Sequence, residues 1–136
     1  MHARKAMSVS EQILYLRLLE ALPERIVLAK VSLARFLAVD KGSDAIQWHS
    51  RIHRMTADFV ICRKDATVVA VVELDDAGNN AKERRTIFEK KERALAAAGI
   101  PIVRWQAKLM PEVTAIRRQL GQGRLAETQR TTKQAA

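Results

Sequence analysis

The sequence predicts a three-layer α/β domain, in which helices cover both faces of a sheet, and three observations predict it. Apolar runs typical of strands alternate along the chain with segments of helical period. A strand, a long helix and another strand follow one another over residues 67–105, an order typical of a right-handed crossover. The 136 residues, 48% of them hydrophobic, are enough for one domain with a core. We therefore expect the order α-β-(loop or short helix)-β-β-α-β-α.

A helix near the N-terminus is predicted from its capping signal. Residues 1–7 are expected to form a basic arm. Ser8 and Glu11 then have the spacing of a capping box, and Pro23 ends the helix that follows, near residue 21. Residues that recur at helical spacing are expected to form its buried face: Tyr15, Leu18, Leu19 and Leu22.

The remaining elements are predicted from apolar runs and turn residues. Before the long helix we expect a strand over 26–33, a short helix at Phe36 and Leu37, a loop at 42–44, a short helix over 48–55, strands over 57–62 and 67–74, and a loop over 75–80. The long helix is expected over 81–98, with Gly99 at C′. After it we expect a strand over 100–105, a helix over 111–120, and a basic, disordered tail over 121–136.

The charge of the chain indicates a polyanionic partner. The net charge is +9 and the pI is about 10.3, which favour nucleic acid or an anionic membrane surface. No apolar run approaches the ~20 residues of a membrane span, and no signal-peptide core follows the N-terminus, so we expect a cytoplasmic protein without integral membrane association. A peripheral membrane protein that uses the basic tail is a further reading.

Acidic side chains stand at one end of the two central strands. A hairpin over residues 57–76 brings Asp58, at the start of one strand, beside Glu73 and Asp75, at the end of the next. Gathered carboxylates repel one another and lose hydration, and Mg²⁺ or Mn²⁺ would remove that cost. The plain alternative is that each is a strand-end acid facing solvent. In a basic chain, the natural partner of a metal held in this way is a phosphate.

Lys91 and Glu11 each have two readings. The neighbours of Lys91 at i±3 and i±4 are all apolar, so it projects from the buried face of the long helix. Its ammonium either snorkels to water or reaches the carboxylates. Glu11 either completes the capping box alone or also faces the sheet and joins the outer shell of the metal.

Other motifs carry less chemistry. His49 and His53 have an i, i+4 spacing without a third zinc ligand in pattern. The single cysteine, Cys62, excludes an internal disulfide framework and is expected to be a buried apolar residue. Glycine-rich phosphate loops and nucleophile-elbow motifs are absent from the sequence.

With these residues placed, the chain resembles the restriction-endonuclease-like superfamily, the PD-(D/E)XK nucleases, and within it most closely the bacterial domain-of-unknown-function family 2726. The matching segments are Ser8 to Glu11, Leu22-Pro23, 31–33, 58–62, 71–76 and 98–101. The resemblance implies an α-β-β-β-α-β core and Mg²⁺-dependent hydrolysis of phosphodiester bonds. It implies Asp58 and Glu73 as metal ligands and Glu11 as an assisting helix acid.

The chain departs from the superfamily pattern at several positions. Asp75 stands where the lysine usually follows the second acid, and Lys91 would replace that lysine from the helix. Gly78-Asn79 and Ile87-Phe88 replace a Ser-His and an Arg-Asp pair that the related family tends to carry. A catalytically inactive module that binds DNA or a protein partner therefore remains the alternative.

Duplex DNA is the expected partner of the basic residues, because an aromatic content of 4% argues against a platform that stacks single strands. Nuclease folds of this size often form homodimers to cut both strands, and no dimer face can be identified in the sequence. The expected phosphate contacts are Lys82, Arg84, Arg85, Lys90, Arg117 and Arg118.

Overall fold

Strands and helices alternate along the chain in the predicted order. The computed structural model describes residues 1–76, 78 and 80–121. Its strands are β1 (Ile26–Ser32), β2 (Thr56–Cys62), β3 (Val68–Asp75) and β4 (Ile102–Gln106). Its α-helices are α1 (Val9–Ala21), α2 (Ala45–Arg54), α3 (Ala81–Ala97) and α4 (Val113–Leu120), and short 3-10 helices η1 (Leu33–Arg35) and η2 (Ala107–Leu109) follow β1 and β4.

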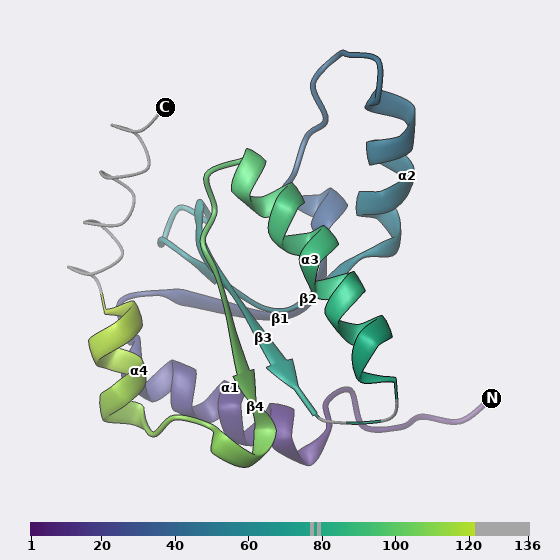
Figure 1. Ribbon diagram of the computed structural model, residues 1–136. Helices are drawn as coiled ribbons and strands as arrows, with labels where there is room; N and C mark the ends of the chain where they lie inside the picture. Colours follow the sequence, from purple (N-terminus) through teal and green to yellow (C-terminus); the bar gives the residue numbers. More distant parts are fainter. Residues whose placement is uncertain (77, 79, 122–136) are drawn as a thin grey trace.

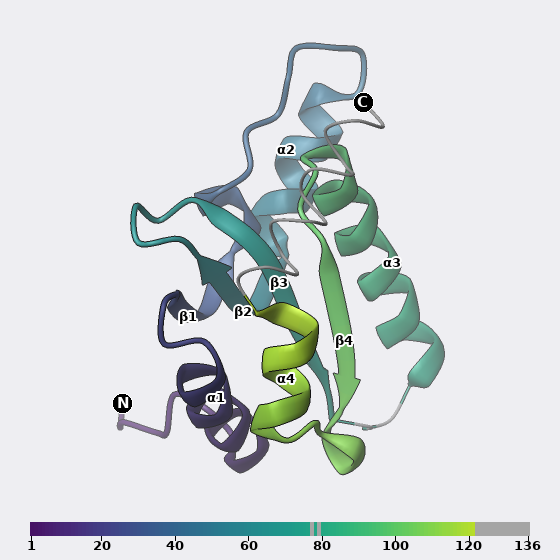
Figure 2. The same ribbon diagram turned by 90° about the vertical axis from the view of Figure 1, so that its left-hand side faces the viewer.

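The strands form one mixed sheet in the order β1-β2-β3-β4. The pairs β1–β2 and β2–β3 are antiparallel, and β4 lies parallel to β3 after the crossover through α3. Figures 1 and 2 show helices on both sides of this sheet. The predicted α/β class, the mixed sheet and the flanking helices are therefore confirmed.

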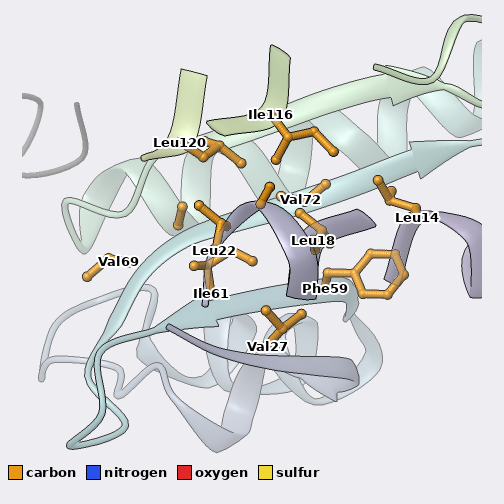
Figure 3. Packing of buried hydrophobic residues seen from close by; sticks show 12 residues of the cluster. Leu14, Leu18, Leu22, Val27, Phe59, Ile61, Val69, Val72, Ile116 and Leu120 are labelled. Carbon is orange, nitrogen blue, oxygen red and sulfur yellow. The ribbon is translucent and has the colours of Figure 1, made fainter. Parts of the chain in front are cut away.

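Side chains alternate between the two faces of the sheet along each strand, so the protein has two separate hydrophobic cores, one on each face. On one face, α1 and α4 pack against the sheet around Leu18, Phe59 and Ile116, and Figure 3 shows this cluster. On the other face, α2 and α3 pack around Ile52, Val71 and Leu95. Helices and apolar side chains cover both faces of the sheet. Polar side chains from different elements therefore meet at the ends of the strands.

Helix α1 begins as predicted but buries a different set of residues. Ser8 and Glu11 form both bonds of the capping box. Leu19 is 39% exposed and Tyr15 only half-buried, whereas Leu14 is fully buried beside Leu18. The predicted buried face is thus wrong at Leu19, because α1 is apolar on nearly every side and its period does not single out one face.

Most other boundaries differ from the predicted ones by a few residues. The short helix predicted at Phe36 and Leu37 lies slightly earlier, as the 3-10 helix η1, and α2 follows it before β2. Asp75 ends β3 and is not a loop residue. Gly99 has φ 72°, the left-handed conformation expected at C′. The predicted tail lies, from residue 122 on, outside the described residues. No helix in the described ranges is long and apolar enough to cross a membrane.

Candidate functional site

Two carboxylates lie together at the open end of the β2–β3 hairpin. The backbone ladder between these strands has its outermost pair at Phe59 and Val72. Beyond it, side chains act as acceptors: the Asp58 N–H donates to Glu73 Oε2 at 2.7 Å, and the Leu74 N–H donates to Asp58 Oδ2 at 2.9 Å. Asp58 and Glu73 are thereby fixed next to each other, as the hairpin predicts.

Helix α3 brings a lysine to this pair. Lys91 Nζ lies 2.5 Å from Glu73 Oε1, and the two side chains are only 13% and 8% exposed. The ammonium therefore reaches the carboxylates and does not snorkel to water. A short, buried, charge-assisted contact of this kind holds both side chains in one orientation.

The surroundings of Glu73 destabilise the charged form of its carboxyl group. Burial and the neighbouring charge of Asp58 raise the pKa of Glu73, and Lys91 offsets only part of that effect. A raised pKa means that the charged form is less stable here than in water. Additional positive charge beside Asp58 and Glu73 would relieve this cost.

Asp75 lies in a different environment from the other two acids. Arg84 Nε lies 3.2 Å from its Oδ1, and Arg104 Nη2 lies 2.9 Å from its Oδ2. The Arg104 guanidinium also lies over the ring of Phe88, 5.0 Å from its centroid. Within residues 1–76, 78 and 80–121, no group of three or more His, Cys, Asp or Glu side chains is placed to hold a metal ion. The structure thus brings Asp58 and Glu73 together and directs Asp75 toward arginines.

Glu11 serves the capping box and the site together. Its Oε1 accepts the Ser8 N–H at 2.8 Å, and its Oε2 lies 2.5 Å from Lys30 Nζ. Lys30 Nζ also lies 2.8 Å from Asp58 Oδ1. Burial acts to raise the pKa of Glu11, but the bonds from Lys30 and Ser8 outweigh it and lower the pKa. Glu11 therefore completes the capping box and also faces the site through Lys30, whereas its place in the outer shell of a metal stays a prediction.

Lys30 is one of two residues of the site that the sequence did not identify. Partial burial alone would lower its pKa, but the bonds to Asp58 and Glu11 raise the pKa above its ordinary value. The available signal is a single charge, between Ala29 and Val31, in a strand whose other residues are apolar except for Ser32. Arg104 was missed for a similar reason, because it is a lone charge in β4.

Two adjoining hollows open at the carboxylates. One has a volume of about 240 Å³ on the α3 side and is lined by Asp58, Glu73, Asp75, Lys91, Arg104 and neighbours. The other has a volume of about 190 Å³ on the α1 side and is lined by Ser8, Glu11, Lys30, Asp58, Leu74 and Asp76. Asp58 lines both, so a ligand in either hollow would meet it.

The predicted phosphate contacts divide between the two faces of the sheet. Lys82, Arg84 and Arg85 line a further hollow of about 460 Å³ beside Asp75, and Lys90 is exposed on the same helix. Arg117 lies on α4, where it pairs with Glu24 and donates to the Ala21 carbonyl oxygen. The exposed histidines of α2, His49 and His53, lie outside the linings of the hollows beside Asp58 and Asp75.

Comparison with known proteins gives one match. The chain matches the model of a family described as "Protein of unknown function (DUF2726)" over residues 3–123. No curated protein and no solved structure gives a significant match.

Proposed function

The chain belongs to the DUF2726 family, and from that premise we propose that it is a metal-dependent nuclease of the restriction-endonuclease-like fold. The observation that carries the proposal is the placement of Asp58 and Glu73 side by side, with Lys91 on Glu73, in an open hollow. The order α1-β1-β2-β3-α3-β4 supports it, because the PD-(D/E)XK resemblance implies an α-β-β-β-α-β core with acids at these positions.

The residues present fit a magnesium or manganese ion. Asp58 and Glu73 provide carboxylate oxygens, which Mg²⁺ prefers, and each oxygen has a second lone pair beyond the bond described above. Burial and the charge of Asp58 raise the pKa of Glu73, so its charged form would be favoured by a cation placed beside it. Asp58 and Glu73 would hold the ion, which would polarise the scissile phosphate and lower the pKa of a bound water.

The side chains around this pair would position the substrate. Lys91, fixed on Glu73, would orient the attacking water or stabilise charge that develops on the phosphate. Glu11 would act through Lys30, which contacts Asp58. Lys82, Arg84 and Arg85 would contact neighbouring phosphates of duplex DNA.

A cleavage assay with matched variants tests the proposal. Plasmid DNA is incubated with the purified full chain in Mg²⁺ or Mn²⁺. Asp58→Asn and Glu73→Gln should abolish cleavage, and Lys91→Met should reduce it by about 100-fold or more, as expected for loss of one group that stabilises developing charge. Lys64→Met is the control, because Lys64 is exposed in the turn between β2 and β3 and lines none of the hollows beside the carboxylates. Cleavage that survives in Asp58→Asn would assign the activity to another site.

A specific observation favours a second candidate, a nuclease-fold module that binds DNA or a protein without cutting. Four acids at the site already have a basic partner: Glu11 and Asp58 have Lys30, Glu73 has Lys91, and Asp75 has Arg84 and Arg104. The protein thus compensates part of the charge without an ion. Salt-sensitive DNA binding without cleavage in either metal would select this candidate.

A further inference from the structure

Lys30 has an unusual backbone conformation for a strand residue. Its φ is 54°, in the left-handed region that side-chain-bearing residues rarely adopt. The β1–β2 ladder pairs Ala29 with Phe59 and Val31 with Ala57, and leaves out the position between them, where Lys30 faces Asp58. Such outliers persist only where the surrounding structure imposes them, and they are concentrated at functional sites.

The ammonium of Lys30 joins acids from two different elements. Nζ lies 2.5 Å from Glu11 Oε2 on α1 and 2.8 Å from Asp58 Oδ1 on β2. Both are charge-assisted contacts, so the ammonium compensates the negative charge of the two carboxylates. Carboxylate oxygens from two elements that converge on one point repel one another unless a cation lies between them, and here that cation is Lys30.

The Lys30 side chain is also partly exposed to solvent. Its side chain is 44% exposed, and it lines the hollow on the α1 side together with Glu11 and Asp58. Asp58 also lines the hollow on the α3 side, where it adjoins Glu73. Asp58 therefore stands between two cation positions, one of which Lys30 fills.

We propose that Lys30 is a resident cation that takes the place of a second divalent ion between Glu11 and Asp58. The inference rests on the proposed function for the other position, at Asp58 and Glu73, where a single exchangeable ion binds. A tethered ammonium cannot dissociate. The negative charges of Glu11 and of Asp58 Oδ1 are therefore compensated at any metal concentration. Lys30 is then a positioning residue, which acts on the reaction through Asp58.

Removal of Lys30 should create a new metal site. We expect Lys30→Met to bind about one more Mn²⁺ per chain than the wild type, counted from the electron paramagnetic resonance signal of free Mn²⁺ during titration. The double variant Lys30→Met/Glu11→Gln should return to the wild-type count. Lys64→Met is the matched control, because Lys64 is exposed in the turn between β2 and β3, and it should bind as the wild type does.

The outcomes separate this inference from the proposed function. An equal count in Lys30→Met and the wild type overturns the role of Lys30. A wild type that binds no ion, with a Lys30→Met variant that binds one, overturns the metal site at Asp58 and Glu73 but supports Lys30.

A second variant keeps the test decisive if circular dichroism shows that Lys30→Met does not fold. Glu11→Gln should keep the wild-type count, because Glu11 contacts Lys30 and not the exchangeable ion. Loss of an ion in Glu11→Gln would show that Glu11 is itself a metal ligand, and would overturn the inference.

Discussion

Glu73 is the one acidic residue of the described chain that is buried, with a relative exposure of 6%. Its two oxygens accept from groups that would otherwise be unpaired, the Asp58 N–H and the Lys91 ammonium. Removing one partner of a buried ion pair leaves the other charge uncompensated. The free energy of unfolding therefore falls by more than the intact pair contributes to it. The orientation of Asp58 therefore depends on Glu73, and a substitution at Glu73 has to preserve an acceptor if its effects are to be interpreted.

The raised pKa of Glu73 predicts how stability depends on pH in the absence of metal. Between the ordinary value of 4.5 and the raised pKa, the native state binds more protons than the unfolded state. The free energy of unfolding therefore falls as the pH rises through this window. Urea unfolding of Glu73→Gln, which keeps an acceptor oxygen, should lack this component of the slope.

Glu11 provides an internal contrast for that measurement. Its pKa is lowered, so its contribution to stability is present above the ordinary value of 4.5 and is lost as the pH falls below it. Glu11→Gln should therefore remove this component of the slope below 4.5, and above 4.5 it should lower the free energy of unfolding without changing its slope. Equal slopes above that pH in the wild type and Glu73→Gln would exclude Glu73 as the source.

Individual elements show which features can be predicted from sequence. The capping box at Ser8, the left-handed Gly99 and the inward projection of Lys91 are local patterns, and the structure has all of them. The conformation of Lys30 could not be predicted, because it depends on β1, β2 and α1 meeting at one point. The arginine partners of Asp75 were missed as well, because Arg104 becomes its neighbour only through the parallel pairing of β3 with β4.

The capping box of α1 gives a prediction at this scale. Ser8→Ala removes the acceptor of the Glu11 N–H and should lower the free energy of unfolding by about 1 kcal/mol, measured by urea titration. Ser10→Ala on the same helix is the control, and it should be neutral or slightly stabilising because alanine has the higher helix propensity. Equal losses in both variants would mean that the box does not stabilise α1.

The molecule as a whole distributes its basic residues unevenly with respect to the site. The sheet separates α3, with Lys82, Arg84 and Arg85 beside the carboxylates, from α4, with Arg117 and Arg118. Arg117 is engaged with Glu24. A net charge of +9 therefore attracts nucleic acid to the whole surface, but the α3 group lies where a bound phosphate would adjoin Asp58 and Glu73.

This distribution predicts how DNA affinity depends on salt. Each phosphate contact releases counterions and contributes about 0.9 to the slope of log K against log salt concentration. The double variant Lys82→Gln/Arg85→Gln should lower that slope by about 2, measured by fluorescence anisotropy with duplex DNA in EDTA, which prevents cleavage. The exposed pair between Arg85 and Glu89 stabilises the free protein little, so its loss should leave the fold intact.

Arg118→Gln changes an exposed charge on the opposite face and should leave the slope nearly unchanged. A larger loss in Arg118→Gln than in the α3 variant would place the DNA on α4, away from the carboxylates, and would separate binding from the proposed catalytic site.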